Sequence, residues 1–233
     1  FSFDVTDLLA GSGPHEIVVR VRDPSDQITQ PSGKQVVSPH GIWYTPSTGI
    51  WQTVWLESVP VHHVERLHLE PDAAAGLLRL TVQSAAPGDT YAVRATALVD
   101  EIAVATATGA PGETLVLAPA EPRLWSPGSP FLYDLRVELL RGGEAIDVVD
   151  SYFGLRSIAL GRGDDGVVRF HLNGEPLFQY GTLDQGFWPD GLYTAPTDEA
   201  LRHDIETTRA LGFNMIRKHV KVEPARWYYW ADR

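Results

Sequence analysis

The sequence predicts a mainly β chain with a C-terminal α/β portion, and three observations carry this prediction. Apolar and polar residues alternate with period two in many short runs before residue 158, which indicates strands with one buried face. From about residue 158 the period changes, and an apolar stripe at helical spacing lies between two strand-like runs. The resulting order, strand, helix, strand, helix, is the repeating unit of a parallel α/β barrel.

Residues 1–60 are expected to form strands. Period-two alternation occurs at residues 1–5, 17–22 and 49–57. In the last run Trp51 and Trp55 lie on one face, and we expect them to pack as a pair at a sandwich interface. Three or four strands rarely make a stable sandwich alone, so partner strands are expected before Phe1.

Residues 61–157 contain several short alternating runs separated by turn residues, which favours an immunoglobulin-like β-sandwich. The chain has no Cys, so this domain is not a disulfide-linked antibody-type domain. The alternation predicts which side chains are buried: Leu80, Val82, Val93, Ala95, Leu135 and Val137. It predicts that their neighbours are exposed: Arg79, Thr81, Arg136 and Glu138.

Residues 158–233 should open a parallel barrel, for which there is room for about two of the eight units required. The dipeptides Asp165-Gly166 and Asn173-Gly174 predict tight turns. Strands are expected at residues 177–181 and 213–220, with a helix between them that starts at an N-cap, Thr197, and ends at Gly212. Its apolar stripe would consist of Leu201, Ile205, Thr208 and Leu211. Pro224 suits the first turn of a second helix.

The composition excludes several classes of function. The formal net charge of −11 disfavours binding to nucleic acid or to an anionic membrane surface. No apolar run approaches the length of a membrane span. Without Cys there is no thiolate metal site or Cys nucleophile, and the scattered His residues lack ligand spacing, so neither a metal nor a cofactor is expected. The chain begins within a strand pattern, so the native start should precede Phe1, and cytosol and exterior stay open.

Three stretches in this order resemble glycoside hydrolase family 2, the group of β-galactosidases, β-glucuronidases and β-mannosidases. They are Gly49-Ile-Trp-Gln-Thr-Val-Trp-Leu-Glu, then Leu124-Trp-Ser-Pro-Gly-Ser-Pro-Phe-Leu-Tyr with Tyr152-Phe-Gly-Leu-Arg, then residues 172–233. The resemblance implies the end of a jelly-roll-like sugar-binding sandwich at 1–60, an immunoglobulin-like sandwich at 61–157, and the incomplete start of a catalytic TIM barrel at 158–233. It implies a retaining hydrolase that cleaves β-linked glycosides.

The chain departs from the family pattern at two places. The usual Arg-Gly-x-Asn-x-His stretch stands here as Gln179-Tyr-Gly-Thr-Leu-Asp-Gln, in which only Gly181 matches cleanly. The later Arg-x-x-His pattern appears as Arg217-Lys-His219, which is one residue shorter. By the resemblance, the family's catalytic Glu preceded by Asn would lie on a late barrel strand. No Asn-Glu pair occurs in this chain, so no catalytic residue is assigned to it.

The candidate substrate-binding residues are Arg217, His219, Asp184, Trp188 and Asp190. Arg217 and His219 share a face near the carboxyl end of the second barrel strand, where barrel enzymes place their sites. A guanidinium and an imidazole there could bind sugar hydroxyls or orient a carboxylate, or could form a structural ion pair. Asp184, Trp188 and Asp190 follow the first strand, where Trp could stack on a sugar or pack as a loop hinge.

Two interpretations of the function stay open. In the first, the chain is a portion of a glycosidase and is inactive alone; its Glu residues at 175, 199, 206 and 223 are expected to be solvated charges rather than catalytic. In the second, it is a non-catalytic carbohydrate-binding or scaffolding β-sandwich module. Besides a β-glycoside, the expected partners are a second copy of the chain or the remainder of the same polypeptide.

Overall fold

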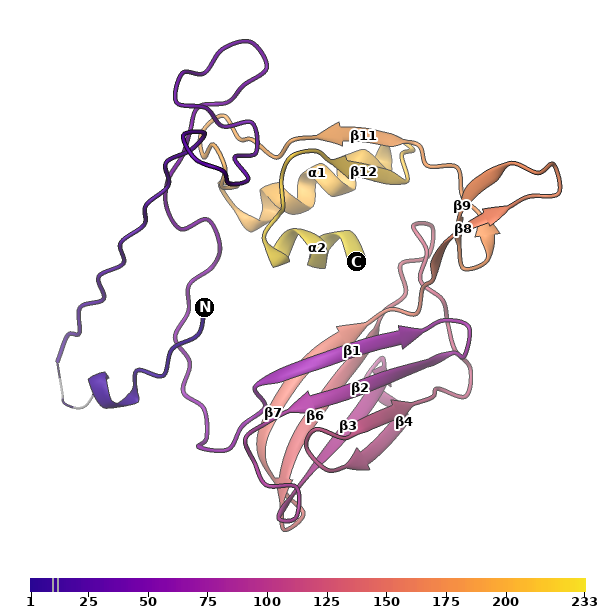
Figure 1. Cartoon of the computed structure of the whole chain (residues 1–233). Coiled ribbons are helices and arrows are strands. Elements are labelled where there is room, and N and C mark those ends of the chain that lie inside the picture. Colours follow the sequence, from indigo (N-terminus) through magenta and orange to yellow (C-terminus); the bar gives the residue numbers. More distant parts are fainter. Residues whose placement is uncertain (10, 12) are drawn as a thin grey trace.

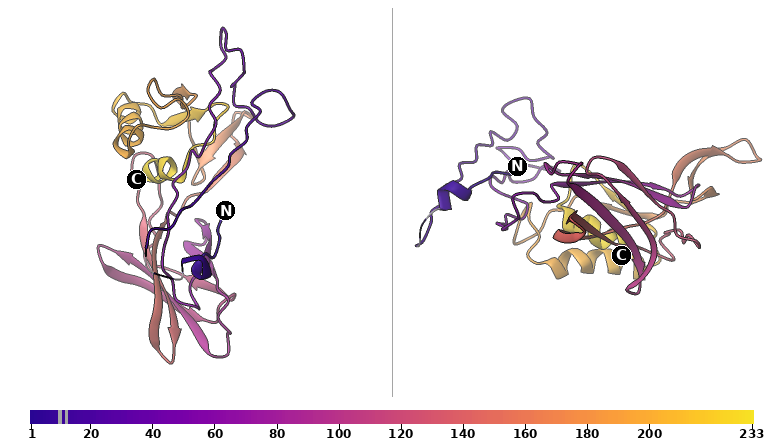
Figure 2. Two further views of the ribbon diagram at one scale, coloured as in Figure 1. Left: turned by 90° about the vertical axis from the view of Figure 1, so that its left-hand side faces the viewer. Right: turned by 90° about the horizontal axis from the view of Figure 1, so that it is seen from below.

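The computed structural model describes residues 1–9, 11 and 13–233, and it shows three parts in chain order (Figure 1). A long N-terminal segment is followed by a two-sheet β-sandwich and then by a small α/β portion. The α/β portion lies at one end of the sandwich, and the N-terminal segment runs alongside both (Figures 1 and 2). Among the described residues, no helix is long and apolar enough to cross a membrane.

The strands expected in residues 1–60 are not formed, and this prediction was wrong. The described part of this segment contains one 3₁₀ helix, η1 (Thr6–Leu9), and an isolated bridge between Gln35 and Tyr44. Its extended stretches have no neighbouring strand to accept and donate ladder hydrogen bonds, so alternation alone does not produce a sheet. Val19 is exposed accordingly.

The two Trp residues of this segment do not form the expected interface pair. Trp55 is 71% exposed. Trp51 instead packs edge-on against Tyr193 of the α/β portion, with ring centroids 5.4 Å apart. The described residues of the segment form no sandwich, and its aromatic contacts with Tyr193 and Phe187 are made where it passes the C-terminal portion.

The sandwich consists of two antiparallel sheets. One has the order β1-β2-β5, made of β1 (Arg66–Asp72), β2 (Leu77–Gln83) and β5 (Thr114–Leu117). The other has the order β4-β3-β6-β7, made of β4 (Ile102–Gly109), β3 (Tyr91–Val99), β6 (Tyr133–Arg141) and β7 (Glu144–Phe153). The chain therefore changes sheet three times, between β2 and β3, between β4 and β5, and between β5 and β6, as in a Greek-key sandwich.

The burial predicted for the sandwich is confirmed. Side chains from both sheets form one core, and all six residues predicted to be buried are at most 1% exposed. Their neighbours Arg79 and Arg136 are exposed, and Thr81 and Glu138 are partly exposed. The strand register is therefore the one that the alternation specifies, since a slip by one residue would exchange the two sets.

A buried tyrosine closes one corner of the sandwich. Tyr133 begins β6 and is 1% exposed, and its hydroxyl accepts a hydrogen bond from the backbone N–H of Arg123 at 2.7 Å. Its ring stacks on Phe153 of β7 with centroids 4.9 Å apart. A tyrosine at this strand that bonds back to the upstream backbone is typical of immunoglobulin-like sandwiches.

A β8–β9 hairpin, extended by the short strand β10 into a small three-stranded sheet, connects the sandwich to the α/β portion. It consists of β8 (Ile158–Arg162), β9 (Val168–Leu172) and β10 (Glu175–Pro176). The turns predicted at Asp165-Gly166 and Asn173-Gly174 are confirmed, and Asn173 and Gly174 both have positive φ. The Asn173 side chain accepts from the Ser157 N–H and donates to the Trp125 carbonyl, both at 2.9 Å, which ties the hairpin to the sandwich.

The α/β portion contains β11 (Gly181–Asp184), α1 (Asp198–Ala210), β12 (Met215–Lys218) and α2 (Ala225–Asp232). The two strands pair in parallel, with α1 as the crossover. The element order is the predicted one, and Thr197 caps α1 as expected by accepting from the Ala200 N–H. Helix α1 stops before Gly212, whose φ is +87°.

Three details of the α/β portion differ from prediction. The first strand begins at Gly181 rather than residue 177, because the Asn214 side chain bonds the Tyr180 N–H and the Phe178 carbonyl. Leu211 follows α1 as its C-cap and is exposed rather than part of the apolar stripe. Pro224 is the N-cap of α2, one position before the first turn.

Candidate functional site

The two parallel strands sort the candidate residues onto opposite faces. Gly181 pairs with Met215, Thr182 with Ile216, Leu183 with Arg217, and Asp184 with Lys218. Thr182, Asp184 and Ile216 line a cavity together with residues of α1, and the charges of Asp184 and Lys218 act on Asp204 of that helix, so their face is the one that the helix covers. Leu183 also borders this cavity, although it is 53% exposed. Leu183 and Arg217 are exposed on the other face. The predicted residues Arg217 and Asp184 are therefore not brought together.

His219 lies just beyond the end of β12. Its backbone N–H donates to the Asp184 carbonyl at 2.8 Å, which extends the contact between the two strands by one residue. Its side chain is partly exposed. Arg217 and His219 thus lie at the carboxyl end of β12, as their positions in the sequence predicted, with Arg217 on the uncovered face.

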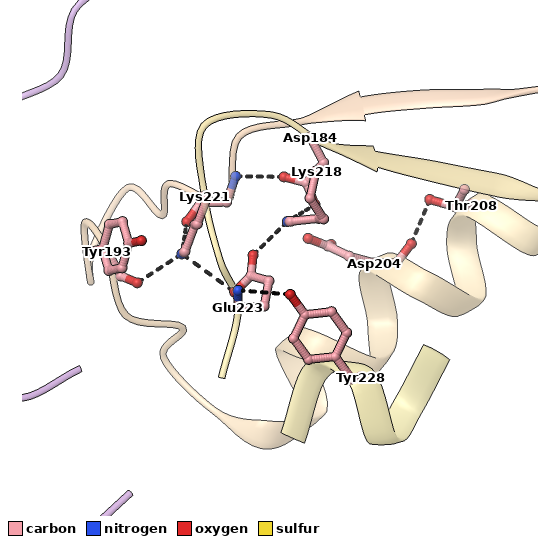
Figure 3. A network of polar contacts seen from close by, with 9 residues as sticks. Asp184, Tyr193, Asp204, Thr208, Lys218, Lys221, Glu223 and Tyr228 are labelled. Atoms are coloured by element: carbon pink, nitrogen blue, oxygen red, sulfur yellow. Dashed lines mark hydrogen bonds and ion pairs between the residues drawn. The ribbon is translucent and has the colours of Figure 1, made fainter. Parts of the chain in front are cut away.

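Four charged side chains form an ionic cluster at the carboxyl ends of the strands: Asp184, Lys218, Lys221 and Glu223 (Figure 3). The Lys218 ammonium nitrogen lies 2.6 Å from Asp184 Oδ2 and 2.5 Å from Glu223 Oε1. Lys221 Nζ lies 3.6 Å from Glu223 Oε2. The side chains of Lys221 and Glu223 are 1% and 2% exposed, so these charges are withdrawn from water.

The expectation that Glu223 is a solvated charge was wrong. It precedes α2 in the sequence, but two lysines surround it in the interior. Buried charges persist in proteins when they are paired, and this carboxylate has two cationic partners. Glu175, Glu199 and Glu206 are exposed, as predicted.

The ionic cluster shifts the protonation of its members and neighbours. Burial lowers the pKa of Lys221, while the Glu223 carboxylate opposes that shift. Loss of surrounding water raises the pKa of Asp204 on α1, and the nearby Asp184 charge raises it further. Burial also raises the pKa of Tyr193, with a smaller contribution from Glu223. Of these three groups, Asp204 lines the cavity beside α1, whereas Lys221 and Tyr193 do not. Perturbed pKa values occur at functional sites and also in structural ion-pair networks.

The loop between β11 and α1, residues 185–197, carries the other predicted residues. Trp188 exchanges backbone hydrogen bonds with Leu192, at 2.8 and 3.0 Å, and Asp190 is exposed at the tip. Two polar atoms of this loop, Gln185 Oε1 and Trp188 Nε1, are buried without a hydrogen-bond partner among the described residues. Buried polar groups normally have partners, so these two atoms indicate where a ligand could bond.

The N-terminal segment also reaches this loop. The ring of Tyr44 stacks on Phe187 with centroids 3.7 Å apart and planes 4° apart. Tyr44 and Phe187 line a cavity of 430 Å³ together with Asp184 and Gln185 and with the α1 residues His203, Asp204, Thr207 and Thr208. The cavity therefore lies where β11, α1 and the N-terminal segment meet.

A second contact region joins α2 to the sandwich. The backbone carbonyl of Asp232 accepts from Trp125 Nε1 at 2.6 Å, and its carboxylate accepts from the Tyr152 hydroxyl at 3.1 Å. Arg156 forms an ion pair with the same carboxylate at 3.5 Å. These side chains line a cavity of 520 Å³ between the two parts. Asp232 is thus the point at which α2 is fixed to the sandwich.

Tyr152 should titrate at unusually high pH. Burial, and then the Asp232 carboxylate, raise its pKa to about 12. Because the folded-state pKa exceeds the unfolded value of about 10, the stability that Tyr152 contributes is complete below pH 10 and is lost as the pH rises towards 12. The difference in tyrosinate absorbance between the wild type and Tyr152→Phe should show a midpoint near 12. A difference titration centred near pH 10 would contradict the contact with Asp232.

Comparison with known proteins identifies the family of the sandwich. Residues 62–156 match the family model described as glycosyl hydrolases family 2. The resemblance to this family is confirmed. The matched residues span the sandwich from just before β1 to just after β7. No group of three or more potential metal ligands occurs among the residues that the structure describes.

Several curated relatives match most of the chain. It is 28% identical over 244 residues to a putative beta-glucuronidase of Formosa agariphila, covering 96% of this chain and 27% of that protein. It is 26% identical to the beta-galactosidase BoGH2A of Bacteroides ovatus, covering 93% of this chain and 25% of that protein. The chain thus spans about a quarter of the length of these two curated relatives.

Solved structures share the fold. A beta-glycosidase from Bacteroides vulgatus aligns with a TM-score of 0.64 at 21% identity, over 73% of this chain and 23% of that one. The beta-glucuronidase of Ruminococcus gnavus aligns with a TM-score of 0.60 at 19% identity, over 74% of this chain and 28% of that one. At these identities the likeness supports the fold alone.

Sequence reasoning missed Lys218, Lys221 and Gln185 as candidates and misjudged Glu223. One signal was present: residues 218–223 place three charges of both signs beside two valines and His219 at the end of a strand. Charged residues at such a position are costly to bury singly, so a run of this kind favours a paired cluster.

Proposed function

We propose that this chain is a portion of a retaining glycoside hydrolase that cleaves β-linked glycosides. In this proposal residues 1–60 are the end of a sugar-binding sandwich, residues 61–157 are an immunoglobulin-like domain, and residues 158–233 open the catalytic TIM barrel. The observation that carries it is the family 2 match over the sandwich, followed after the β8–β10 strands by a parallel strand–helix–strand–helix unit.

The two faces of β11 and β12 support the barrel assignment. Helix α1 covers one face, as helices cover the outside of a barrel, and the other face presents Leu183 and Arg217. In a closed barrel that second face would point inward. Arg217 would then project into the interior near the carboxyl ends of the strands, where it could bind a sugar hydroxyl or orient a carboxylate.

The other candidate residues would act from the same end of the barrel. His219 follows β12, and Trp188 and Asp190 lie on the loop after β11, so all three would border a substrate bound there. Asp184 lies on the helix-covered face and is paired with Lys218. Its contribution to substrate binding would therefore be made mainly through the loop that it supports.

The catalytic carboxylates would be supplied by other parts of the polypeptide. A retaining glycosidase needs two carboxyl groups about 5–5.5 Å apart, one of them able to act as a nucleophile. Of the four Glu residues after residue 157, Glu223 is held between two lysines and the other three are exposed. The proposed role of this chain is to bind and position, with a carbohydrate substrate as its ligand and the remaining barrel as its partner.

Residues 1–233 alone should therefore not hydrolyse chromogenic β-galactosides, β-glucuronides or β-mannosides above background. A longer polypeptide that carries this chain within a complete barrel should hydrolyse at least one of them, with retention of the anomeric configuration in the product seen by NMR. Turnover by residues 1–233 that survives repurification would contradict the proposal. If the longer polypeptide binds sugars without hydrolysing them, the chain belongs to a non-catalytic module.

A further inference from the structure

We propose that Lys221 is a positioning residue whose ammonium group fixes the loop of residues 185–197 in the shape that presents Gln185 and Trp188 to a polyhydroxylated ligand. The identity of that ligand as a sugar rests on the proposed glycosidase function. The inference that Lys221 fixes the loop does not depend on the identity of the ligand, because it is drawn from the contacts that Lys221 makes.

Lys221 bonds both arms of this loop (Figure 3). Its Nζ donates to the carbonyl of Tyr193 at 2.9 Å and to the carbonyl of Gly186. The Glu223 carboxylate lies 3.6 Å from the same ammonium nitrogen and balances its charge. Because the side chain is 1% exposed, water does not compete for these charge-assisted hydrogen bonds. One cation therefore closes the loop on itself and on the chain that follows β12.

The ionic cluster also holds Gly186 from its other side. The Gly186 N–H donates to Asp184 Oδ1 at 2.6 Å, while its carbonyl accepts from Lys221. Gly186 has a φ of +63°, and a Cβ built on it would collide with Glu223 and Lys221. Only glycine satisfies both demands, the left-handed backbone and the close approach of the two charged side chains. The loop is therefore held at one defined residue.

Two residues close to this fixed point in the chain carry buried polar atoms that have no hydrogen-bond partner among the described residues. Gln185 directly precedes Gly186, and its Oε1 is a buried acceptor without a donor; Trp188 Nε1 is a buried donor without an acceptor. A buried polar group without a hydrogen bond costs free energy, and a ligand that supplies the missing hydrogen bond would remove that cost. A sugar hydroxyl both donates and accepts, and neighbouring hydroxyls could serve the two atoms. Gln185 and Lys221 are not among the residues that sequence reasoning assigned to substrate binding.

The first test follows hydrogen exchange of residues 187–192 in this chain. In Lys221→Met these amides should exchange about tenfold faster or more, the change expected from losing a hydrogen bond to a charged group. Lys221→Arg should restore part of the protection. The matched control is Arg209→Met, an exposed cation in the last turn of α1, which should leave the loop unchanged. Unchanged exchange in Lys221→Met would overturn the proposal.

The second test measures sugar turnover in a longer polypeptide that contains this chain and a complete barrel. Lys221→Met should raise KM about tenfold and change kcat less than about threefold, since it would weaken sugar binding without touching the reacting atoms. Gly186→Ala, which displaces the same loop without removing a charge, should raise KM similarly, and Lys221→Arg should recover most of the loss.

These outcomes distinguish a failure of the proposed glycosidase function from a failure of the inference about Lys221. If the longer polypeptide hydrolyses no glycoside, the proposed function fails, and the hydrogen-exchange result still decides whether Lys221 fixes the loop. If the loop loosens in Lys221→Met but KM is unchanged, the loop does not present groups to the sugar and the inference is wrong. If kcat falls with KM unchanged, Lys221 acts on the chemical step instead, which also overturns it.

Discussion

Replacing Glu223 by Gln should destabilise the α/β portion by about 3–5 kcal/mol, the cost of breaking a buried ion pair by removing one partner. The substitution would leave Lys218 and Lys221 buried near each other with Asp184 as the remaining carboxylate of the cluster. The amide of Gln keeps the shape of the side chain, so the loss of unfolding free energy would arise from the missing charge rather than from altered packing. Urea unfolding followed by Trp fluorescence measures it.

The matched control for this substitution is Glu206→Gln. Glu206 also pairs with a cation, since its carboxylate lies 2.7 Å from Arg202 Nε on α1, but both side chains are more than half exposed. Exposed pairs of this spacing contribute only about 0.3–0.5 kcal/mol. If the two substitutions cost the same, the burial of the ionic cluster does not contribute to stability as argued.

Shortening Leu135 to Ala should cost about 2–5 kcal/mol, because it removes buried methyl groups and leaves a cavity in the sandwich core. Leu135 is 1% exposed on β6, between β3 and β7 in the sheet. Val148→Ala on the adjacent strand β7 is the comparison, since Val148 is 47% exposed and its loss should cost about 0.5 kcal/mol or less. If Leu135→Ala and Val148→Ala lower the unfolding free energy equally, the core does not lie on the side of the sheet that the alternation predicts.

The sandwich could be predicted from sequence because three of its strands, β2, β3 and β6, obey one local rule. In β2, β3 and β6 the buried side chains alternate with more exposed ones. The position of a residue such as Leu80 or Val137 in this alternation is therefore enough to predict which face of the sheet it lies on. The same rule failed at residues 17–22, where the alternation is equally regular. A strand needs a neighbour within hydrogen-bond reach, and a local pattern does not show whether one is present.

The candidate site, like the fold, could be predicted from the sequence only in part. The positions of Arg217 and Asp184 at strand ends followed from the predicted element order. The ionic cluster did not, because it joins Asp184 at the end of β11 to Lys218 and Glu223, more than 30 residues later in the chain. Whether Glu223 meets water or two lysines depends on how the loops after both strands fold over each other. Its local sequence, a charged residue before a helix, resembles that of a solvated one.

The attachment of α2 to the sandwich through Asp232 has a consequence for the order in which the protein forms during synthesis. The last strand of the sandwich ends at Phe153, so the sandwich can fold on the nascent chain while the α/β portion is still inside the ribosome. Trp125, Tyr152 and Arg156 are then already in place when Asp232 emerges. The sandwich would thereby act as an intramolecular template that orients α2, and with it α1 and the parallel strands β11 and β12.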